Sequence, residues 1–592
     1  MRAIRFNLGL AVMVVLLLGG PAASPALSQG RGAAPKDQPL EWKVPQSQIK
    51  IGPPQWKGAP PQGDKAAAPA TANVKDMYFG AKGDGARDDT ASIQSAVDFV
   101  HARGGGTIIF PPGTYLVTSV NLREGITYQG VGEAVIKRPD QLFQKQKFPR
   151  TFTNQKYAYY GEKDSAPIIF KNLVFDGNSQ NQGPYKKYEQ EHADLLFLTA
   201  RRDSPGRLQV VIEDCLFRNS VSDGISIYKN VDVKVNNCTA IDCFRGGFLI
   251  LGGNTRAVLT NYTGKGKNDP AGIDVELSGD SEGYGNSTKV EFYMENINLP
   301  DGVFDIGLGF GSKVVGKNIY SHGFFNLVAP GSTVTLSHCK FGIPPGARIV
   351  WPHRVTFEHC EFTALGNKDK PPALQAAPFI AWNLSGTSEK NQSVTFINCK
   401  FNVADGVAPE TKVNGIATGR DGVDYHNILT VQGGNFSKRI NEALAMYRGG
   451  HWRIKDAVVE SALPFAWTGF KDSFGDAYAD IVIDGATIKT KKYMAIGGYP
   501  DKNHPNRLEH KNLEMDESAN YISSFYGLEG NQYAGHRVIW GSAPPTPATH
   551  GLVGDIYRLK DSPAEWVCTK AGYYYEREKK QIMAEWQPRK PS

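Results

Sequence analysis

The sequence predicts an all-β fold, a parallel β-helix solenoid in which short strands wind into stacked coils. Three observations support this class. A short phrase recurs along the chain, its copies are spaced by little more than twenty residues, and glycine is abundant at 64 of 592 residues. A supersecondary unit that repeats at this period cannot bury its apolar face alone, so neighbouring units stack into a solenoid.

The recurring phrase places two apolar residues at alternate positions, then a mostly polar two-residue step, then cysteine and a further apolar residue. Alternation with a period of two is typical of a strand, and short polar side chains in the step favour a bend. Each copy therefore predicts a strand, a bend and a second strand, with the apolar residues and the cysteine on one side. The copies are VVIEDCLF at 210–217, VKVNNCTA at 233–240, VTLSHCKF at 334–341, VTFEHCEF at 355–362 and VTFINCKF at 394–401, and IIFKNLVF at 168–175 has leucine in the cysteine slot.

The spacing of the cysteines favours a β-helix. Cys215 and Cys238 are 23 positions apart, and Cys339 and Cys360 are 21 apart. Leucine-rich repeats share this period, but their leucine-rich consensus is absent and no helical stripe separates the strands. Residues of successive coils would stack about 4.8 Å apart. Because five of the seven cysteines fall in this inward ladder, we expect buried free thiols rather than a disulfide framework; the phrase leaves the state of Cys243 and Cys568 open.

The first residues have the pattern of a secretory signal over 1–28. Arg2 and Arg5 precede the apolar run Leu8–Leu18, and Ala26–Ser28 offers a small-residue cleavage site. An uncleaved anchor is the alternative, although the run is short for a membrane span. The sequence thus predicts a secreted or periplasmic bacterial protein with no membrane contact after cleavage, followed by a Pro/Ala-rich linker at 29–74.

Charge excludes one class of partner. The net charge of +7 is modest for 592 residues, and basic and acidic residues are interspersed. We therefore expect no nucleic-acid partner.

A single helix is expected near the start of the repeats. Gly104–Gly106 would end this helix, which would close the first coil of the solenoid. Asp84, Asp88 and Asp89 are expected to act as turn and cap residues rather than as a metal site. The apolar residues at helical spacing are Ile93, Ala96, Val97 and Val100.

Two motifs in this stretch carry a family resemblance. FGAKGDG at 79–85 and GGGTIIFPPGTY at 104–115 resemble the N-terminal part of the pectate-lyase-like superfamily, which includes rhamnogalacturonases and epimerase-like proteins. The resemblance implies a right-handed parallel β-helix over 75–500 with an N-terminal capping helix, and a polysaccharide partner. It does not imply one activity: polygalacturonase-like members carry Asn-Thr-Asp, Asp-Asp, Gly-His-Gly and Arg-Ile-Lys on successive coils, whereas this chain has VSDG at 221–224 and FRGG at 244–247, without the Gly-His-Gly.

Residues 501–592 change character and are expected to form a small C-terminal β segment. GDIY at 554–557 and WVCT at 566–569 resemble the end of some secreted and tail-spike-like β-helix proteins. The resemblance implies a cap or an attachment segment rather than chemistry.

A second strand phrase predicts the candidate catalytic site. DGISIY, GGFLIL, AGIDVE, VFDIGL and FFNLVA occur at 223–228, 246–251, 271–276, 303–308 and 324–329. Their alignment predicts an inward row of Ile225, Phe248, Ile273, Phe304 and Phe325, and an outward row of Ser226, Leu249, Asp274, Asp305 and Asn326.

The outward row brings carboxylates together. Asp274 and Asp305 would lie about 5 Å apart on neighbouring coils, and Asp274 and Glu276 about 6.6 Å apart along one strand. Like charges at such distances raise one another's pKa or require a cation. The separations bracket those of retaining and inverting glycosidases, and the three carboxylates could instead hold Ca²⁺.

Other candidates surround these acids. Asp223, Arg245 and His322 begin nearby strands and would rim the same groove, and an arginine beside a base suits a lyase that removes the proton next to a uronate carboxylate. A solvated polar ladder without chemistry is the alternative. Four tryptophans of the later coils could stack on sugar rings, with core or turn packing as the alternative for each: Trp351, Trp382, Trp452 and Trp467.

Together these features predict a secreted enzyme that cleaves glycosidic bonds of a polysaccharide, pectin-like or otherwise acidic, by hydrolysis or by elimination. The alternative is a non-catalytic glycan-binding or structural β-helix. No cofactor is required by the pattern, apart from the Ca²⁺ considered above.

Overall fold

The computed structural model describes residues 69–590, apart from residues 147–148, 184–191, 267–271, 278–288, 302, 324, 345–346, 351, 366–376, 384–392, 419–427, 447–449, 468–478, 497–505, 525–527 and 529–530. All of these described residues belong to the compact unit Lys57–Ser592. The expected signal and nearly all of the expected linker lie outside them.

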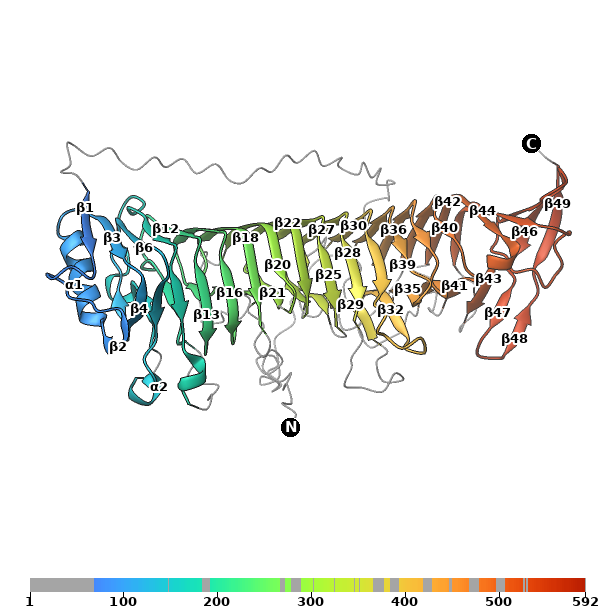
Figure 1. The fold of residues 1–592 in the computed structure, drawn as a ribbon. Coiled ribbons are helices and arrows are strands. Elements are labelled where there is room, and N and C mark those ends of the chain that lie inside the picture. The colour runs from blue at the N-terminus through green and yellow to red at the C-terminus, as the bar shows by residue number, and fades with distance from the viewer. Residues whose placement is uncertain are drawn as a thin grey trace, which may run out of the picture. The chain divides into compact units, whose positions relative to one another are not determined.

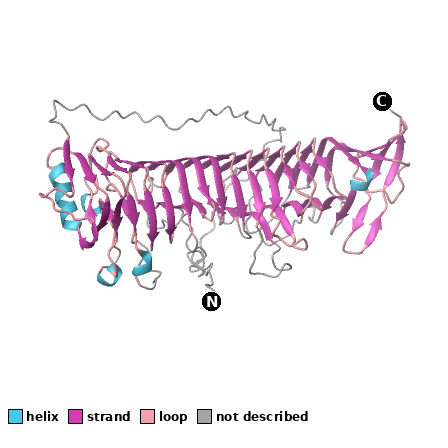
Figure 2. Cartoon of the chain, viewed as in Figure 1, coloured by secondary structure: helices cyan, strands magenta, loops and turns pink. Residues whose placement is uncertain are grey.

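The described chain winds into coils with three walls, and each strand pairs in parallel with its equivalent in the next coil (Figure 1). Helices are short and few among the described residues (Figure 2). This arrangement confirms the predicted all-β parallel β-helix.

The first wall begins at the N-terminal end and continues through seventeen strands. Its strands are β1 (Ala70–Asn73), β3 (Gly106–Phe110), β6 (Ile126–Gly130), β9 (Ile168–Lys171), β12 (Leu208–Glu213), β15 (Val231–Asn236), β18 (Thr255–Lys265), β20 (Val290–Leu299), β22 (Lys313–His322), β24 (Thr333–Ser337), β27 (Arg354–Glu358), β30 (Ser393–Ile397), β33 (Ile428–Gln432), β36 (Gly450–Lys455), β39 (Ala479–Asp484), β42 (Arg507–Asp516) and β44 (Gln532–Gly541).

The second wall follows the bend after each of these strands, and the long strands β18, β20 and β22 run across the bend into it. Its separate strands are β2 (Asp84–Asp88), β4 (Gly113–Leu116), β7 (Ala134–Lys137), β10 (Val174–Asp176), β13 (Leu216–Ser220), β16 (Thr239–Cys243), β25 (Lys340–Ile343), β28 (Glu361–Ala364), β31 (Lys400–Val403), β34 (Asn435–Phe436), β37 (Val458–Val459) and β40 (Thr487–Ile488).

The third wall carries the second strand phrase. Its strands are β5 (Val120–Asn121), β8 (Phe152–Thr153), β11 (Leu196–Leu198), β14 (Ile225–Ile227), β17 (Phe248–Ile250), β19 (Ile273–Glu276), β21 (Phe304–Gly307), β23 (Phe325–Val328), β26 (Arg348–Val350), β29 (Ala377–Asn383), β32 (Val413–Thr418), β35 (Ile440–Met446), β38 (Leu463–Trp467), β41 (Lys492–Ile496) and β43 (Tyr521–Ser524).

The polar step of the recurring phrase forms the bend between the first and second walls. Asp214 and Asn237 of the phrase adopt left-handed backbone angles there, with φ of 55° and 51°, and Asn261, Asn296 and Asn318 do the same at the bends of β18, β20 and β22, with φ of 51°, 57° and 53°. Their side chains also form a ladder, because Asn296 Nδ2 donates to Asn261 Oδ1 at 3.0 Å and Asn318 Nδ2 donates to Asn296 Oδ1 at 2.7 Å. Asparagine tolerates this conformation better than other non-glycine residues, so the predicted bend has a direct physical cause.

The core lies inside the coils and consists of stacked rows. Phe401 stacks on Phe436 with ring centroids 4.4 Å apart, and Phe175 stacks on Phe217 at 4.9 Å. The five cysteines of the inward ladder are free and buried, as predicted. Cys243 and Cys568, which the phrase did not place, are buried as well.

The capping helix is α1 (Thr90–His101), and the four residues of its predicted apolar face are buried. The three nearby acids hold backbone amides, as expected for turn residues. Asp89 accepts hydrogen bonds from the amides of Lys82 and Gly83 at 2.7 and 2.9 Å, while Asp84 accepts from Ala86 and Asp88 from Thr90. These contacts tie the FGAKGDG loop to the start of the helix.

The parallel coils extend past residue 500, where the sequence shows no clear coil. β42 pairs in parallel with β39 and β44. Leu508, His510, Leu513 and Met515 alternate as its buried residues, and the histidine in an apolar slot hides the pattern. Antiparallel pairing begins later, among the strands β45 (Ile556–Leu559), β46 (Glu565–Lys570), β47 (Tyr573–Tyr575), β48 (Lys580–Ile582) and β49 (Glu585–Arg589).

Candidate functional site

The predicted carboxylate row lies on the third wall. Asp274 of β19 is the register partner of Asp305 of β21, Leu249 of β17 precedes Asp274, and Asn326 of β23 follows Asp305. The predicted inward partners Ile273 and Phe304 are buried. The register of both rows is therefore confirmed.

Asp274 occupies an unusual environment within this row. Its Oδ1 atom is buried and has no hydrogen-bond partner among the described residues. Burial raises the pKa of Asp274 well above its usual range, and the charges of Glu276, Asp305 and Asp223 raise it further, while Arg245 opposes the shift. The side chain is thus held ready to carry a proton.

Arg245 lies between Asp223 and Glu276, which together with Asp274 and Asp305 form an acidic cluster. Its Nη2 contacts Glu276 Oε1 at 2.8 Å, and its Nη1 lies 4.0 Å from Asp223 Oδ2. Asp223 itself is buried, and its Oδ1 has no hydrogen-bond partner within the described part of the chain. Burial and then Asp194 raise the pKa of Asp223 well above its usual range. Arg245 thus lies between the buried Asp223 and the exposed Glu276.

Asp305 differs from Asp274 because an amide holds it. Asn326 Nδ2 donates a hydrogen bond to Asp305 Oδ1 at 2.8 Å. A donor of this kind stabilises the charged form of a carboxylate. Asp274 and Asp305 therefore form an adjacent pair that differs in hydrogen bonding.

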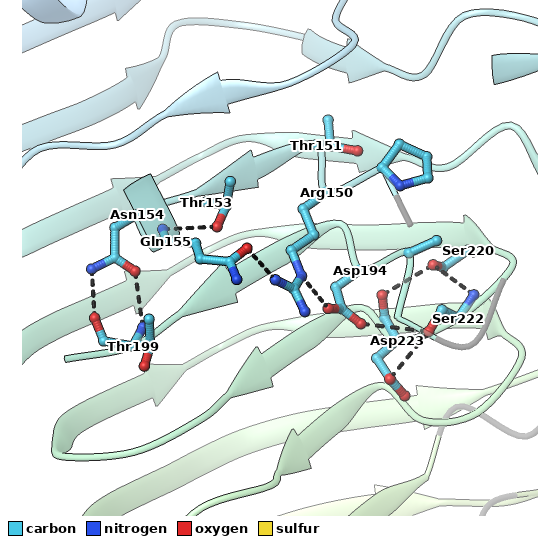
Figure 3. A network of polar contacts seen from close by, with 12 residues as sticks. Arg150, Thr151, Thr153, Asn154, Gln155, Asp194, Thr199, Ser220, Ser222 and Asp223 are labelled. Atoms are coloured by element: carbon cyan, nitrogen blue, oxygen red, sulfur yellow. Dashed lines mark hydrogen bonds and ion pairs between the residues drawn. The ribbon is translucent and has the colours of Figure 1, made fainter. Parts of the chain in front are cut away.

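The sequence reasoning missed the continuation of this cluster toward the N-terminus. Arg150 Nε contacts Asp194 Oδ2 at 3.3 Å, and the Ser222 hydroxyl lies 3.4 Å from Asp194 Oδ1 and 3.3 Å from Asp223 Oδ2 (Figure 3). Asp194 stands one coil before Asp223, at the equivalent position of its own strand. The stretch DLLFLT at 194–199 could have been aligned with DGISIY at 223–228 and would have revealed it.

A buried arginine positions the two loops that carry Arg150 and Asp194. Arg138 Nη2 donates to the carbonyl oxygens of Ala193 and Asp194 at 3.0 and 3.1 Å, and to Thr151 Oγ1 at 3.0 Å. Its side chain is fully buried. The loop before β8 and the loop before β11 are thereby fixed relative to each other.

His322 lies on the adjoining wall. It is the last residue of β22 and the register partner of Gly342 on the second wall, and its ring stacks on Tyr320 at 6.3 Å. The structure therefore places His322 beside a different strand set from the carboxylate row.

The tryptophan predictions have separate outcomes. Trp452 is 1% exposed, in register with Leu429 and Ile481 in the core of the first wall. The prediction that it stacks on a sugar is wrong, because a buried ring has no free face. The backbone of Trp382 is in register with that of Ile349, and the backbone of Trp467 with that of Met446. The prediction that these two rings stack on sugars stays a prediction. Trp351 lies outside the described residues.

The calcium alternative gains no support from the geometry of the acids. Across the described residues, no group of three His, Cys, Asp or Glu side chains is arranged to hold a metal ion. Glu276 is directed to Arg245 instead. In the same residues no helix is long and apolar enough to cross a membrane.

Residues 71–274 match the family described as rhamnogalacturonase A/epimerase, pectate lyase-like. Mannuronan C5-epimerase AlgE3 of Azotobacter vinelandii is 32% identical over 232 residues, which is 34% of this chain and 12% of that protein. Alginate lyase 7 of the same organism is 38% identical over 120 residues, 18% of this chain and 13% of that protein. The chain thus matches only about an eighth of the length of these relatives.

Among solved structures, the A-module of mannuronan C-5 epimerase AlgE4 from Azotobacter vinelandii aligns with a TM-score of 0.38 at 20% identity, over 70% of this chain and 97% of that one. Residues 71–274 are thus similar to the pectate-lyase-like family of rhamnogalacturonases and epimerases, and the parallel coils agree with the β-helix fold that this resemblance implies.

Proposed function

We propose that this protein is an enzyme that acts on a uronate-containing polysaccharide by removing the proton next to the uronate carboxylate. The observation that carries the proposal is Asp274, whose buried and unpartnered oxygen lies beside Asp305 and near Arg245. The relatives named as mannuronan C5-epimerases and an alginate lyase support the substrate class.

The chemistry needs three groups. Arg245 neutralises the uronate carboxylate, which makes the adjacent proton more acidic. Asp305, held by Asn326, takes that proton. The electron pair of the broken C–H bond is delocalised into the uronate carboxylate. In elimination the pair then expels the glycosidic oxygen, which takes a proton from Asp274; in epimerisation Asp274 returns a proton to the same carbon from the opposite face.

Hydrolysis is a second candidate because of one observation. Asp274 and Asp305 are register partners on adjacent strands, which places their backbones about 4.8 Å apart. That spacing is compatible with the close carboxyl pair of retaining glycosidases, about 5–5.5 Å apart. In this case Asp274 is the general acid and Asp305 the nucleophile.

One set of assays separates these reactions. The full chain is incubated with polymannuronate and with polygalacturonate. New ultraviolet absorbance indicates elimination, incorporation of deuterium from D₂O without new chain ends indicates epimerisation, and new reducing ends without absorbance indicate hydrolysis. We expect elimination or epimerisation; the absence of all three on both polymers would overturn the proposal in favour of a glycan-binding role.

The role of Asp274 is tested by Asp274→Asn, which preserves shape and removes the acid. We expect activity to fall about 10²–10⁴-fold. Asp232→Asn is the matched control, since Asp232 is also buried with a raised pKa but lies on the first wall. Full activity of Asp274→Asn would remove the assignment. We further propose that the protein acts outside the cytoplasm, which mass analysis of a mature N-terminus at Gln29 would test.

A further inference from the structure

A cavity of about 320 Å³ opens on the third wall, toward the N-terminal side of the carboxylate row. Phe197 and Thr199, which are buried, contribute to its lining, and Tyr228 and Leu251 come from the two following coils. Its polar side is formed by Arg150, Gln155 and His192. None of these residues belongs to the proposed catalytic set.

The cavity lies in line with Asp274. Phe197, Ser226, Leu249 and Asp274 are successive register partners on β11, β14, β17 and β19. Three strand spacings separate Phe197 from Asp274, a distance of about 14 Å. This is longer than one sugar ring, so a ligand that fills the cavity and reaches Asp274 must be an oligosaccharide.

Arg150 is the cation of the cavity, and it is held in a fixed orientation. Its guanidinium lies over the Phe197 ring, 3.5 Å from the ring centroid, and its Nε is bound to Asp194. Its side chain keeps 17% exposure. A planar guanidinium fixed in this way is suited to bind a carboxylate.

The aromatic lining of the cavity suits a sugar ring. Tyr228 is half-buried, and its ring centroid lies 6.0 Å from that of Phe197. Lys229 places its Nζ 4.6 Å from the Tyr228 ring. An aromatic side chain near cations is the combination expected for an anionic sugar, whose ring contacts the apolar face while its acid contacts the charge.

We infer that this cavity is a subsite for one uronate residue of the polysaccharide, with Arg150 bound to the uronate carboxylate some three coils before the site of chemistry. The inference rests on the proposed function for the nature of the ligand. It adds a consequence that the carboxylate row alone does not have, namely that binding strengthens when an oligosaccharide is long enough to span both places.

The test measures binding rather than turnover. Mannuronate oligosaccharides of two to eight residues are titrated calorimetrically into the full chain carrying Asp274→Asn, and then into the same chain with Arg150→Gln added. We expect affinity to rise with length in the first protein, and to fall about tenfold or more for the longer oligosaccharides when Arg150 is replaced. Carboxyl-reduced oligosaccharides should bind equally to both proteins.

A matched control addresses folding. Arg207 is 15% exposed and lies 3.1 Å from the buried Asp232. Arg150 is similarly 17% exposed and lies 3.3 Å from the buried Asp194. The difference is that Arg207 precedes a strand of the first wall, away from the cavity. Arg207→Gln should therefore perturb stability to a similar degree and leave binding unchanged. Equal affinity with and without Arg150, or an equal loss in Arg207→Gln, would overturn the subsite.

The two proposals fail separately. Arg150-dependent binding without any turnover of uronate polymers would contradict the proposed reaction and retain the subsite. Turnover with a KM that Arg150→Gln leaves unchanged would retain the reaction and contradict the subsite.

Discussion

Asp274 and Asp305 are register partners on adjacent strands, yet only Asp305 receives a hydrogen bond from a neighbouring amide, that of Asn326. Asp274 keeps a buried oxygen without a partner. The same backbone geometry therefore gives two carboxyl groups with different hydrogen-bond partners. This difference, rather than the mere presence of acids, makes the row a candidate for proton transfer.

The pH dependence of the protein's stability should reflect the raised pKa of Asp274. An acid whose pKa is higher in the folded than in the unfolded state stabilises the fold at low pH, and this stabilisation is lost as pH rises from the unfolded value through the folded one. Asp274→Asn has no such loss. We expect the variant to be at least as stable as the wild type at pH 8, with a difference that shrinks toward pH 4, measured by thermal unfolding across pH. A constant difference would contradict the assigned shift.

Arg245 should control the pH range of activity. Its charge lowers the pKa of both Asp223 and Asp274, against the effect of burial. In Arg245→Gln those pKa values rise further, so the alkaline limb of the pH–rate profile should move to higher pH while the maximal rate falls. The measurement is kcat/KM between pH 4 and 10. Arg256→Gln, which removes a half-exposed arginine near Glu291 on the first wall, should leave the profile unchanged.

The asparagine ladder at the bend between the first and second walls predicts that the left-handed backbone of Asn296 limits which residues fit there. Two variants can separate this backbone effect from the loss of hydrogen bonds. Asn296 has φ of 57° and makes side-chain hydrogen bonds to both neighbouring coils. Asn296→Ala loses the hydrogen bonds and places alanine in a left-handed conformation, which costs about 1–2 kcal/mol. Asn296→Gly loses only the hydrogen bonds. We expect the denaturation midpoint to fall more for alanine than for glycine; the reverse order would show that the backbone conformation is not the limiting factor.

The cysteines should be inert in the folded protein. All seven are free and buried, so a reagent cannot reach them in the native protein. Burial raises the pKa of the Cys243 thiol to about 12, whereas hydrogen bonds with Cys339 and Cys399 lower the pKa of Cys360 to about 4. A thiol reagent at pH 8 should therefore modify none in the native protein and seven in denaturant, with Cys360 the first to react if a coil opens. Rapid modification of any one would locate a coil that opens.

The sequence predicted those features that repeat. Alternation and spacing predicted the coils, the inward cysteines and the register of Asp274 with Asp305, because each depends only on strand period and stacking. It could not predict Arg150 or Arg138, which lie in single loops without repeats. Trp452 was misplaced because the recurring phrase was not extended to WRIKDAVV at 452–459, where Trp452 alternates with Ile454 and Asp456 takes the bend, so that the ring faces inward.

The C-terminal end depends on one buried ion pair. Arg537 is fully buried, bound through two nitrogens to the carboxylate of the buried Asp555, with a further hydrogen bond to Asn520 at 2.8 Å. Asp555 also accepts the amide of Leu552. The pair thus ties the turn before β45 to the last parallel strands.

Arg537→Met should release this end. The change leaves a buried carboxylate without its cation, which costs about 3–5 kcal/mol. A solenoid unfolds locally because each coil contacts only its neighbours, so hydrogen exchange should accelerate over β44–β49 and remain slow over β12–β24. Lys570→Met is the control, since Lys570 of β46 pairs with Glu585 of β49 in the same segment, both side chains are 62% exposed, and such surface pairs contribute about 0–1 kcal/mol. Uniform acceleration along the whole chain would show instead that the coils unfold as one unit.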